Sequence, residues 1–148
     1  MTDLHLTQSE ADFLLAMEKT AEADIEWEFP TMGMKVEIPL FGPAKRERFM
    51  LDISRGTIDL NRVKYQNRAR QVIILARLEL SGPPHRNPDG AEVPTPHMHR
   101  YVEGFADKWA YSVPTQYFHD LSDRWQTLQD FMGFCNVTQR PRIRMVLL

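Results

Sequence analysis

RQVIILARLEL, residues 70–80, is the strongest strand signal in the chain and decides the fold. In an extended segment alternate residues share a face, and here both faces are apolar at the middle. The first face carries Val72, Ile74, Ala76, Leu78 and Leu80, and the opposite face carries Ile73 and Leu75. A strand buried on both faces at its middle is typical of the centre of a sheet. We therefore expect residues 70–80 to form the central strand.

Shorter segments around this strand also have the two-residue period of strands. Proline and glycine separate them, as they commonly do at strand ends. The segments are IEWEF (25–29), MKVEIPL (34–40), ERFMLDIS (47–54), TIDL (57–60), and an expected edge strand in the tail RIRMVLL (142–148).

Two helices are expected outside the strands. Thr7 and Glu10 match a capping box, and apolar residues at helical spacing predict a helix over residues 9–23. A second apolar stripe predicts a helix within residues 121–136, capped by Ser122. The connections are too short for parallel crossovers. The sequence therefore predicts one α+β domain over residues 1–148, with an N-terminal helix, an antiparallel sheet of about five to seven strands, and a C-terminal helix.

Composition places the chain among ordinary cytoplasmic proteins. A length of 148 residues fits a single core, and 43% hydrophobic and 26% charged residues are usual values. No apolar run approaches the roughly 20 residues of a membrane helix, and the N-terminus lacks the pattern of a secretory signal. The lone Cys135 excludes an internal disulfide framework and fits a reducing compartment.

The net charge of −2 hides an asymmetry along the chain. Residues 1–30 carry eight acids and only one base, Lys19, whereas residues 45–77 carry nine bases and three acids. The basic segment has the charge to attract phosphates. The acidic segment can equally fold over it and neutralise it. Both interpretations are open.

Residues 81–96 form a loop of unusual length and composition. Five prolines lie between residues 81 and 96, and Asn87-Pro88-Asp89-Gly90 matches a type I turn. Proline fixes φ, which favours an ordered loop over a disordered one. We expect a rigid loop that holds His85 and Arg86 in a fixed place at the sheet edge.

Residues 97–102 and 105–113 are expected to form a hairpin around a two-residue turn, Glu103-Gly104. In that register His97, His99, Tyr101 and Lys108 share one face. Clustered cationic groups have depressed pKa values, which suits acid–base chemistry near neutral pH. The alternative is a polar, solvent-facing strand surface without a function.

The two hairpin histidines also allow a metal interpretation, since imidazole suits zinc, copper, iron and nickel. His85 or Glu103 could then add a ligand. The segment resembles the first metal motif of cupin barrels, with Gly90 upstream. It departs from that motif at Ala110, where cupins have glycine, and at His119, which lies near the start of a helix. We therefore assign no metal ligand and no cofactor, and keep a metal-dependent enzyme as a third alternative.

Several motifs together resemble a family of small bacterial proteins classed as a domain of unknown function. They are LDISRGTIDL (51–60), YQNRARQVIILARLEL (65–80), GPPHRNPDG (82–90), PHMHRY (96–101), EGFADKWAY (103–111) and WQTLQDFMGFCN (125–136). The resemblance covers about residues 6–136 and implies a bacterial, phage or mobile-element origin, but no established activity.

Small bacterial proteins of this kind are often toxins or defence factors, so our first functional expectation is a nucleic-acid-acting protein, such as a metal-independent endoribonuclease. RNA would be the partner of the basic and aromatic side chains. The expected catalytic residues are His85, His97, His99 and Lys108, and the expected nucleic-acid contacts are Arg68, Arg70, Arg86, Tyr101 and Tyr111. The second expectation is a non-catalytic binder of a cognate protein, of the antitoxin or anti-defence (anti-CRISPR) type. The sequence does not determine the oligomeric state.

Overall fold

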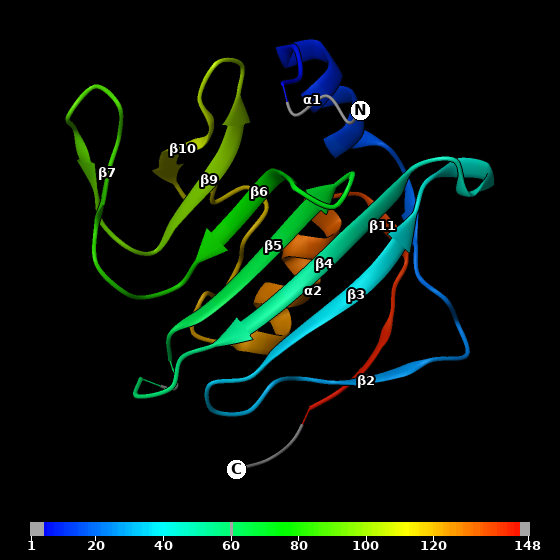
Figure 1. Ribbon diagram of the computed structural model, residues 1–148. Coiled ribbons are helices and arrows are strands. Elements are labelled where there is room, and N and C mark those ends of the chain that lie inside the picture. The colour runs from blue at the N-terminus through cyan, green and yellow to red at the C-terminus, as the bar shows by residue number, and fades with distance from the viewer. Residues whose placement is uncertain (1–4, 60, 146–148) are drawn as a thin grey trace.

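The computed structural model describes residues 5–59 and 61–145, which form a large sheet with a helix packed behind it (Figure 1). The strands of the main sheet are β1 (Lys19–Thr20), β3 (Lys35–Phe41), β4 (Arg48–Arg55), β5 (Val63–Ala69), β6 (Ile73–Glu79), β9 (His97–Val102), β10 (Ala106–Ser112) and β11 (Val137–Gln139). Their order is β10-β9-β6-β5-β4-β3-β1-β11. The helices are α1 (Gln8–Ala16) and α2 (Arg124–Phe134), with a 3₁₀ turn at Pro43–Lys45.

The predicted α+β class is confirmed, but the main sheet has eight strands rather than five to seven. It is also mixed, because β1 pairs with β11 in parallel. A second parallel pair joins β2 (Glu26–Glu28) to β12 (Arg142–Arg144), so the tail strand lies outside the main sheet. These strands have only two or three residues each. Segments this short carry no readable periodicity.

Residues 57–60 do not form the expected strand. Residues 57 and 58 lie in a bend between β4 and β5, and residue 60 lies outside the described residues. The strand that follows is β5, whose alternate residues are fully buried. Every second side chain of β5 faces the core, which is the pattern of a strand with one buried face. The strand expected at residues 57–60 therefore begins later, at Val63.

Both helices differ from their expected bounds. The capping box is confirmed at Thr7 and Glu10, but α1 ends at Ala16 because Met17 is extended and the chain then pairs as β1. Asp123 rather than Ser122 caps α2, through a bond from the Gln126 N–H. The Ser122 hydroxyl instead binds Asp120.

The core lies between α2 and the rear face of the sheet (Figure 1). Leu128, Phe131 and Met132 of α2 are buried, and Phe131 packs on the ring of Tyr65 at a centroid distance of 6.1 Å. The Tyr65 hydroxyl donates to the Arg124 carbonyl at 2.9 Å. Burial of each large side chain contributes roughly 2 kcal/mol, so this contact anchors the helix.

A bulge in β6 determines which of its residues face the core. Asn67 pairs with Ala76 and Arg68 pairs with Ile74, so one extra residue, Leu75, lies on β6. An extra residue shifts the alternation of a strand. Leu75, Ala76 and Leu78 are consequently all buried. Val72 lies in the turn before β6 and is 58% exposed. The bulge turns the polar residues at the end of β6 to the face opposite α2.

Lys19 joins the ends of both helices. Its side chain is fully buried, and Nζ donates to the carbonyls of Leu15, Met17 and Cys135 at 2.8, 3.0 and 2.7 Å. An ammonium has three donors, and all three are used. The Cys135 thiol is buried beside it, and burial raises its pKa to about 12.

Among residues 5–59 and 61–145, an ion pair between Lys45 and Glu22 joins the acidic N-terminal segment to the basic segment. Glu26 and Glu28 instead pair with Arg144 of the tail. In the part of the chain that the structure describes, neither helix is long and apolar enough to cross a membrane.

Candidate metal centre

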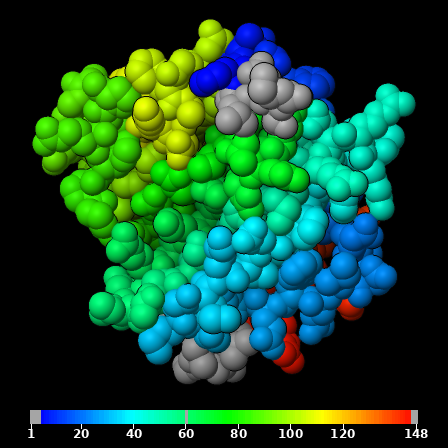
Figure 2. Space-filling model, in the orientation of Figure 1, coloured from blue at the N-terminus to red at the C-terminus, as the bar shows by residue number. Residues whose placement is uncertain are grey.

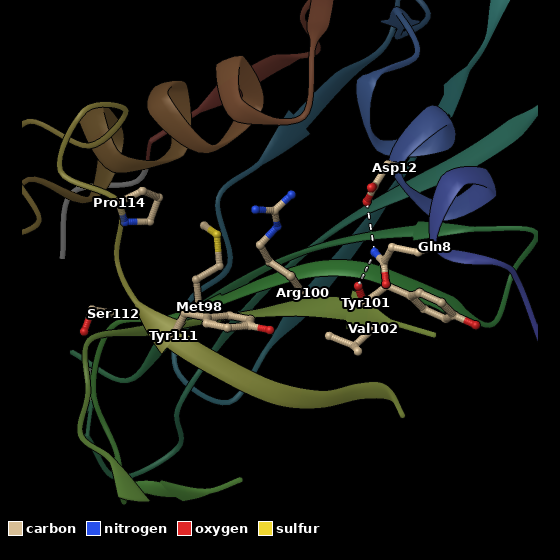
Figure 3. A pocket seen from close by; sticks show the side chains of 9 residues that line it. All are labelled: Gln8, Asp12, Met98, Arg100, Tyr101, Val102, Tyr111, Ser112 and Pro114. Atoms are coloured by element: carbon tan, nitrogen blue, oxygen red, sulfur yellow. Dashed lines mark hydrogen bonds between the residues drawn. The ribbon is translucent and has the colours of Figure 1, made fainter. Parts of the chain in front are cut away.

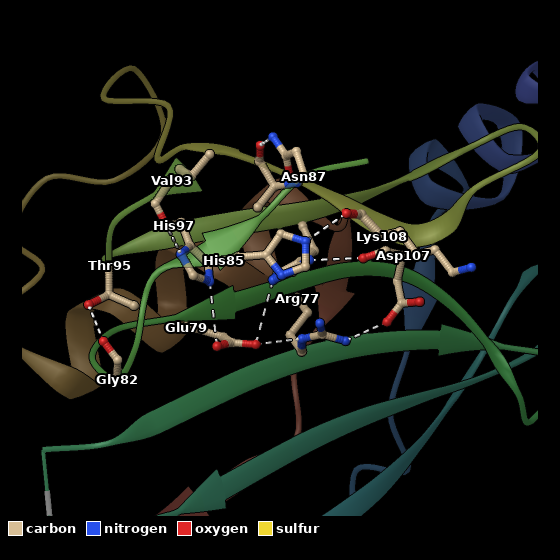
Figure 4. Close-up of polar contacts among 12 residues, drawn as sticks. Arg77, Glu79, Gly82, His85, Asn87, Val93, Thr95, His97, Asp107 and Lys108 are labelled. Atoms are coloured by element: carbon tan, nitrogen blue, oxygen red, sulfur yellow. Dashed lines mark hydrogen bonds and ion pairs between the residues drawn. The ribbon is translucent and has the colours of Figure 1, made fainter. Parts of the chain in front are cut away.

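Two histidines, a glutamate and an arginine meet on the face of the sheet opposite α2. Glu79 of β6 lies directly opposite His97 of β9, and Arg77 lies opposite His99. Directly opposed residues are the closest neighbours across two strands, and alternate residues share a face. The register therefore places both imidazoles beside the Glu79 carboxylate and the Arg77 guanidinium. Figure 4 shows His97 next to Glu79.

A backbone carbonyl orients each of these imidazoles. His97 Nδ1 lies 3.1 Å from the Val93 carbonyl oxygen, and His99 Nδ1 lies 2.9 Å from that of Asp107. Carbonyl oxygens only accept, so Nδ1 carries the hydrogen in both rings. In the neutral form, Nε2 of each ring then keeps its lone pair.

The two lone pairs point at a carboxylate. His97 Nε2 is 3.5 Å from Glu79 Oε2, and His99 Nε2 is 3.6 Å from Glu79 Oε1. His97 and His99 are each 1% exposed, and His97 Nε2 has no hydrogen-bond partner among the described residues. Three acceptors therefore converge, and His97 Nε2 in particular lacks the partner that a buried polar atom needs.

Electrostatics disfavour a proton on His99 beside this carboxylate. Burial is the largest cause that lowers the pKa of His99, to about 4, and the charge of Arg77 adds to it. Burial raises the pKa of Glu79, but the hydrogen bond and charge of Arg77 outweigh burial and leave that pKa below its ordinary value. At neutral pH His99 is thus unprotonated and Glu79 is ionised.

The distances suit a first-row transition metal. In a tetrahedral zinc site the ligand atoms lie roughly 3.3 Å apart, since each is about 2 Å from the metal. His97 Nε2 lies 3.5 Å from Glu79 Oε2 and His99 Nε2 lies 3.6 Å from Glu79 Oε1, and one ligand atom from each of the three residues falls within 4.8 Å of the other two. Metal-binding imidazoles usually donate their other nitrogen to a carbonyl or carboxylate, as both rings do here.

Arg77 fixes the carboxylate in place. Its Nε donates to Glu79 Oε1 at 2.9 Å, and its Nη1 donates to Asp107 Oδ2 at 2.7 Å. The same Asp107 supplies the carbonyl that holds His99. The second carboxylate also offsets the guanidinium charge, so the site is not dominated by the positive charge of Arg77.

The loop of residues 81–96, here called the arm, brings a third imidazole to the site. The arm contains the paired strands β7 (His85–Arg86) and β8 (Glu92–Val93) and lies beside the β9–β10 hairpin (Figure 2). The His85 ring lies 4.5 Å from that of His99 and 6.2 Å from that of His97, between centroids. Its Nε2 is 2.7 Å from the Lys108 carbonyl oxygen. His85 therefore borders the three converging groups without being one of them.

Asn87 attaches the arm to the sheet. Its side-chain amide donates to the Ala110 carbonyl at 3.0 Å and accepts from the Ala110 N–H at 2.8 Å. The turn predicted at residues 87–90 is confirmed by the bond from the Gly90 N–H to the Asn87 carbonyl, at 2.8 Å. These bonds hold the arm over the buried histidines.

Glu103 and Gly104 are the central residues of a turn, as predicted, since the Phe105 N–H donates to the Val102 carbonyl at 2.9 Å. The predicted register is wrong, because Val102 pairs with Ala106 rather than with Phe105, and the register shifts before Trp109. Ala106 has a left-handed conformation with φ of 53°, which is typical of three-residue hairpin loops. Lys108 is consequently exposed, and its carbonyl rather than its ammonium contacts His85.

The three arginines expected to bind phosphate are all paired with carboxylates. These pairs are Arg68 with Asp52 and Glu37, Arg70 with Glu47, and Arg86 with Glu92. They lie on β5, on the turn after it, and on the arm. The three arginines therefore lie on separate elements, and each has a carboxylate partner.

The two tyrosines expected to stack on bases have different surroundings. Tyr101 is 5% exposed, and its hydroxyl accepts from the Leu6 N–H at 2.8 Å and donates to the Leu6 carbonyl at 3.1 Å. A ring enclosed in this way has no face for a base. Tyr111 is 44% exposed and lines a pocket with Met98, on the face opposite the histidines.

Sequence reasoning missed Glu79, the carboxylate of the site, because it lies near the end of the apolar segment 70–80 and belongs to no recognisable motif. One signal in the sequence was the two-residue spacing of Arg77 and Glu79. It equals the spacing of His97 and His99, so the two pairs can face each other on neighbouring strands. Glu103, the carboxylate of the cupin-like pattern, instead accepts from the Gln8 N–H at 2.7 Å. His119 lies in the turns before α2 and its N–H binds Asp130.

Comparison with known proteins gives one match. The model of a family described as "Family of unknown function (DUF6978)" matches residues 6–137. No curated protein and no solved structure matches the chain.

Proposed function

We propose that this chain, which belongs to the family of unknown function DUF6978, is a metal-dependent enzyme whose metal ligands are Glu79, His97 and His99. The observation that carries the proposal is the convergence of the Glu79 carboxylate with two buried imidazole nitrogens whose tautomers are fixed by carbonyls. The same residues serve less well in a metal-independent ribonuclease, since rings that are 1% exposed do not reach a nucleic acid.

A site with two histidines and one carboxylate suits catalysis because it leaves coordination positions for water and substrate. Bound Zn²⁺ would supply a water of lowered pKa, which is the nucleophile of metal-assisted hydrolysis. Among the ligands Glu79 is the most accessible, with a side chain that is 17% exposed against 1% for either histidine. A substrate would therefore approach the site from the side on which Glu79 lies.

The adjoining surface favours a polar substrate. A cavity of about 430 Å³ runs along this face of the sheet and reaches Arg77. The other lining residues include Lys35, Lys64, Arg68 and Glu37. A substrate held there would lie beside Glu79, and His85 would be the nearest titratable group outside the ligand set.

Metal content tests the proposal. The full chain is stripped with EDTA and titrated with Zn²⁺ and with Co²⁺, whose visible absorption reports coordination by imidazole. We expect one equivalent per chain, and at least tenfold weaker binding in Glu79→Gln, His97→Ala and His99→Gln. His119→Ala is the matched control and should bind as the wild type does. Circular dichroism of the stripped variants verifies that each one folds.

Two further results decide between metal-dependent catalysis and its alternatives. Hydrolysis of bis(p-nitrophenyl) phosphate or p-nitrophenyl acetate that is lost with EDTA and restored with Zn²⁺ supports the enzyme. Tight binding of Zn²⁺ without hydrolysis of either ester would indicate that the metal has a structural role and would contradict the enzyme proposal. RNA cleavage that persists in EDTA, or the absence of stoichiometric metal binding, would overturn the proposal.

A further inference from the structure

A second cavity lies on the opposite side of β9 from the histidines. It has a volume of about 550 Å³ and opens between α1 and α2, with β9 and β10 as its floor (Figure 3). His97 and His99 point to one face of β9, so Met98 and Arg100 point to the other. The cavity is therefore separate from the metal centre. Its volume is within the usual range of small-molecule sites.

Arg100 provides the positive charge of this cavity. Its guanidinium points into the gap between the helices and is exposed to solvent (Figure 3). Within residues 5–59 and 61–145 it has no ion-pair partner, unlike Arg68, Arg77 and Arg86. It lies over the Phe134 ring, 5.6 Å from the centroid, which supports the planar group from one side. A guanidinium held in this way presents its paired donors to a carboxylate or phosphate.

The remaining floor of the cavity is largely apolar. Met98, Val102 and Tyr111 rise from the two strands, and Pro114 closes the end near α2 (Figure 3). One charged group among apolar and aromatic side chains is the usual composition of a site for small organic molecules. Apolar contact would hold the body of a ligand while Arg100 holds its charged end.

The helix α1 limits the charge of that ligand. Asp12 lines the same cavity and accepts a hydrogen bond from Gln8 Nε2 at 3.0 Å. The same Gln8 Nε2 also donates to the Tyr101 carbonyl at 3.0 Å. A carboxylate on the wall of the site repels a second negative charge on the ligand. One arginine with one aspartate thus suits a monoanion better than a phosphate dianion.

We propose that this cavity binds a small organic acid, a monocarboxylate with an apolar or aromatic body, with Arg100 as the group that binds its carboxylate. The proposal stands apart from the metal centre. It adds to the protein a ligand site that faces away from the proposed chemistry and touches α1, α2 and the hairpin.

The test uses 3-phenylpropionate, its neutral amide 3-phenylpropanamide, and inorganic phosphate as probes, titrated into the full chain by NMR. We expect 3-phenylpropionate to cause saturable shifts of the Arg100 Nε–Hε and Met98 methyl signals. The amide should bind at least tenfold more weakly, and phosphate should give no saturable shift. The dissociation constant should be equal with and without EDTA, which separates this site from a carboxylate bound to metal.

Variants complete the test. Arg100→Gln, an exposed position, should weaken 3-phenylpropionate binding at least tenfold, whereas the matched control Arg86→Gln should leave it unchanged. Asp12→Asn should tighten binding, because it removes the repelling charge. Absence of saturable shifts in the wild type, equal binding of the amide, unchanged binding in Arg100→Gln, or tighter binding of phosphate would each overturn the proposal.

Discussion

Replacement of Lys19 by methionine tests how the two helices are attached to the sheet. The Lys19 ammonium donates to Leu15, Met17 and Cys135, and it lies 4.7 Å from the centroid of the Phe49 ring. Methionine keeps the length of the side chain and its packing on the ring but removes all three donors. Three carbonyls at two helix ends then lose their partner.

The expected loss follows from those three bonds. A buried acceptor without a donor costs about 1 kcal/mol, so Lys19→Met should lower the free energy of unfolding by about 3 kcal/mol at pH 7. For a chain of this size that corresponds to a fall in Tm of roughly 6–12 °C. The control is Lys45→Met, since Lys45 also lies over a phenylalanine ring, at 5.1 Å, but is exposed. We expect its effect to stay within about 0.5 kcal/mol.

The pH dependence of this difference adds a second readout. Burial lowers the pKa of Lys19 to about 8 from its ordinary value of 10.5. Between these values the unfolded chain holds a proton that the folded chain has released, so stability from Lys19 rises with pH. The gap between wild type and Lys19→Met should thus widen by up to about 3 kcal/mol from pH 8 to pH 10.5. Urea denaturation at pH 7, 8, 9 and 10 measures it.

Two outcomes would contradict this account of Lys19. A free energy of unfolding for Lys19→Met within 0.5 kcal/mol of the wild type would mean that the three bonds contribute nothing net. A gap that narrows as the pH rises would mean that burial does not lower the pKa of this amine.

Two other contacts give predictions of the same kind. Asp52→Asn should destabilise the protein by about 3 kcal/mol in urea denaturation, because Arg68 loses its buried ion-pair partner and keeps the exposed Glu37 as its only carboxylate among the described residues; an effect below 1 kcal/mol would show that the pair is solvated. Tyr101→Phe should cost about 1–2 kcal/mol, since both bonds to Leu6 disappear. Hydrogen exchange should then speed up at the Leu6 amide, and unchanged exchange would argue against the attachment of the N-terminal segment by this hydroxyl.

The sequence predicted the long elements of the fold and missed those that depend on distant partners. The apolar run of residues 70–80 correctly predicted a strand inside the sheet, because burial on both faces leaves a clear pattern. The bulge at Leu75 was not predictable, since it appears only where β5 pairs with β6. The pairs β1–β11 and β2–β12 join segments more than 100 residues apart, and so they too had no local signal.

The candidate site was also predicted only in part, because some of its features have a local sequence pattern and others depend on strand pairing. Proline content and turn chemistry indicated an ordered arm, and the structure brings His85 to the hairpin histidines. The role of Glu79 depends on the register between β6 and β9, which no single segment encodes. The hairpin register was misjudged by one residue because Ala106, a residue without a preference for positive φ, adopts the left-handed conformation.

The attachment of Asn87 to Ala110 has a consequence for self-association. The outermost strand of a sheet offers unpaired backbone groups to any other extended chain, which is a common route to fibrils. Here a side-chain amide occupies both groups of Ala110, on the last strand of the main sheet, in the way a ninth strand would. The arm thus blocks this part of the sheet edge, because the backbone groups of Ala110 are not free to pair with a β-strand from a neighbouring molecule.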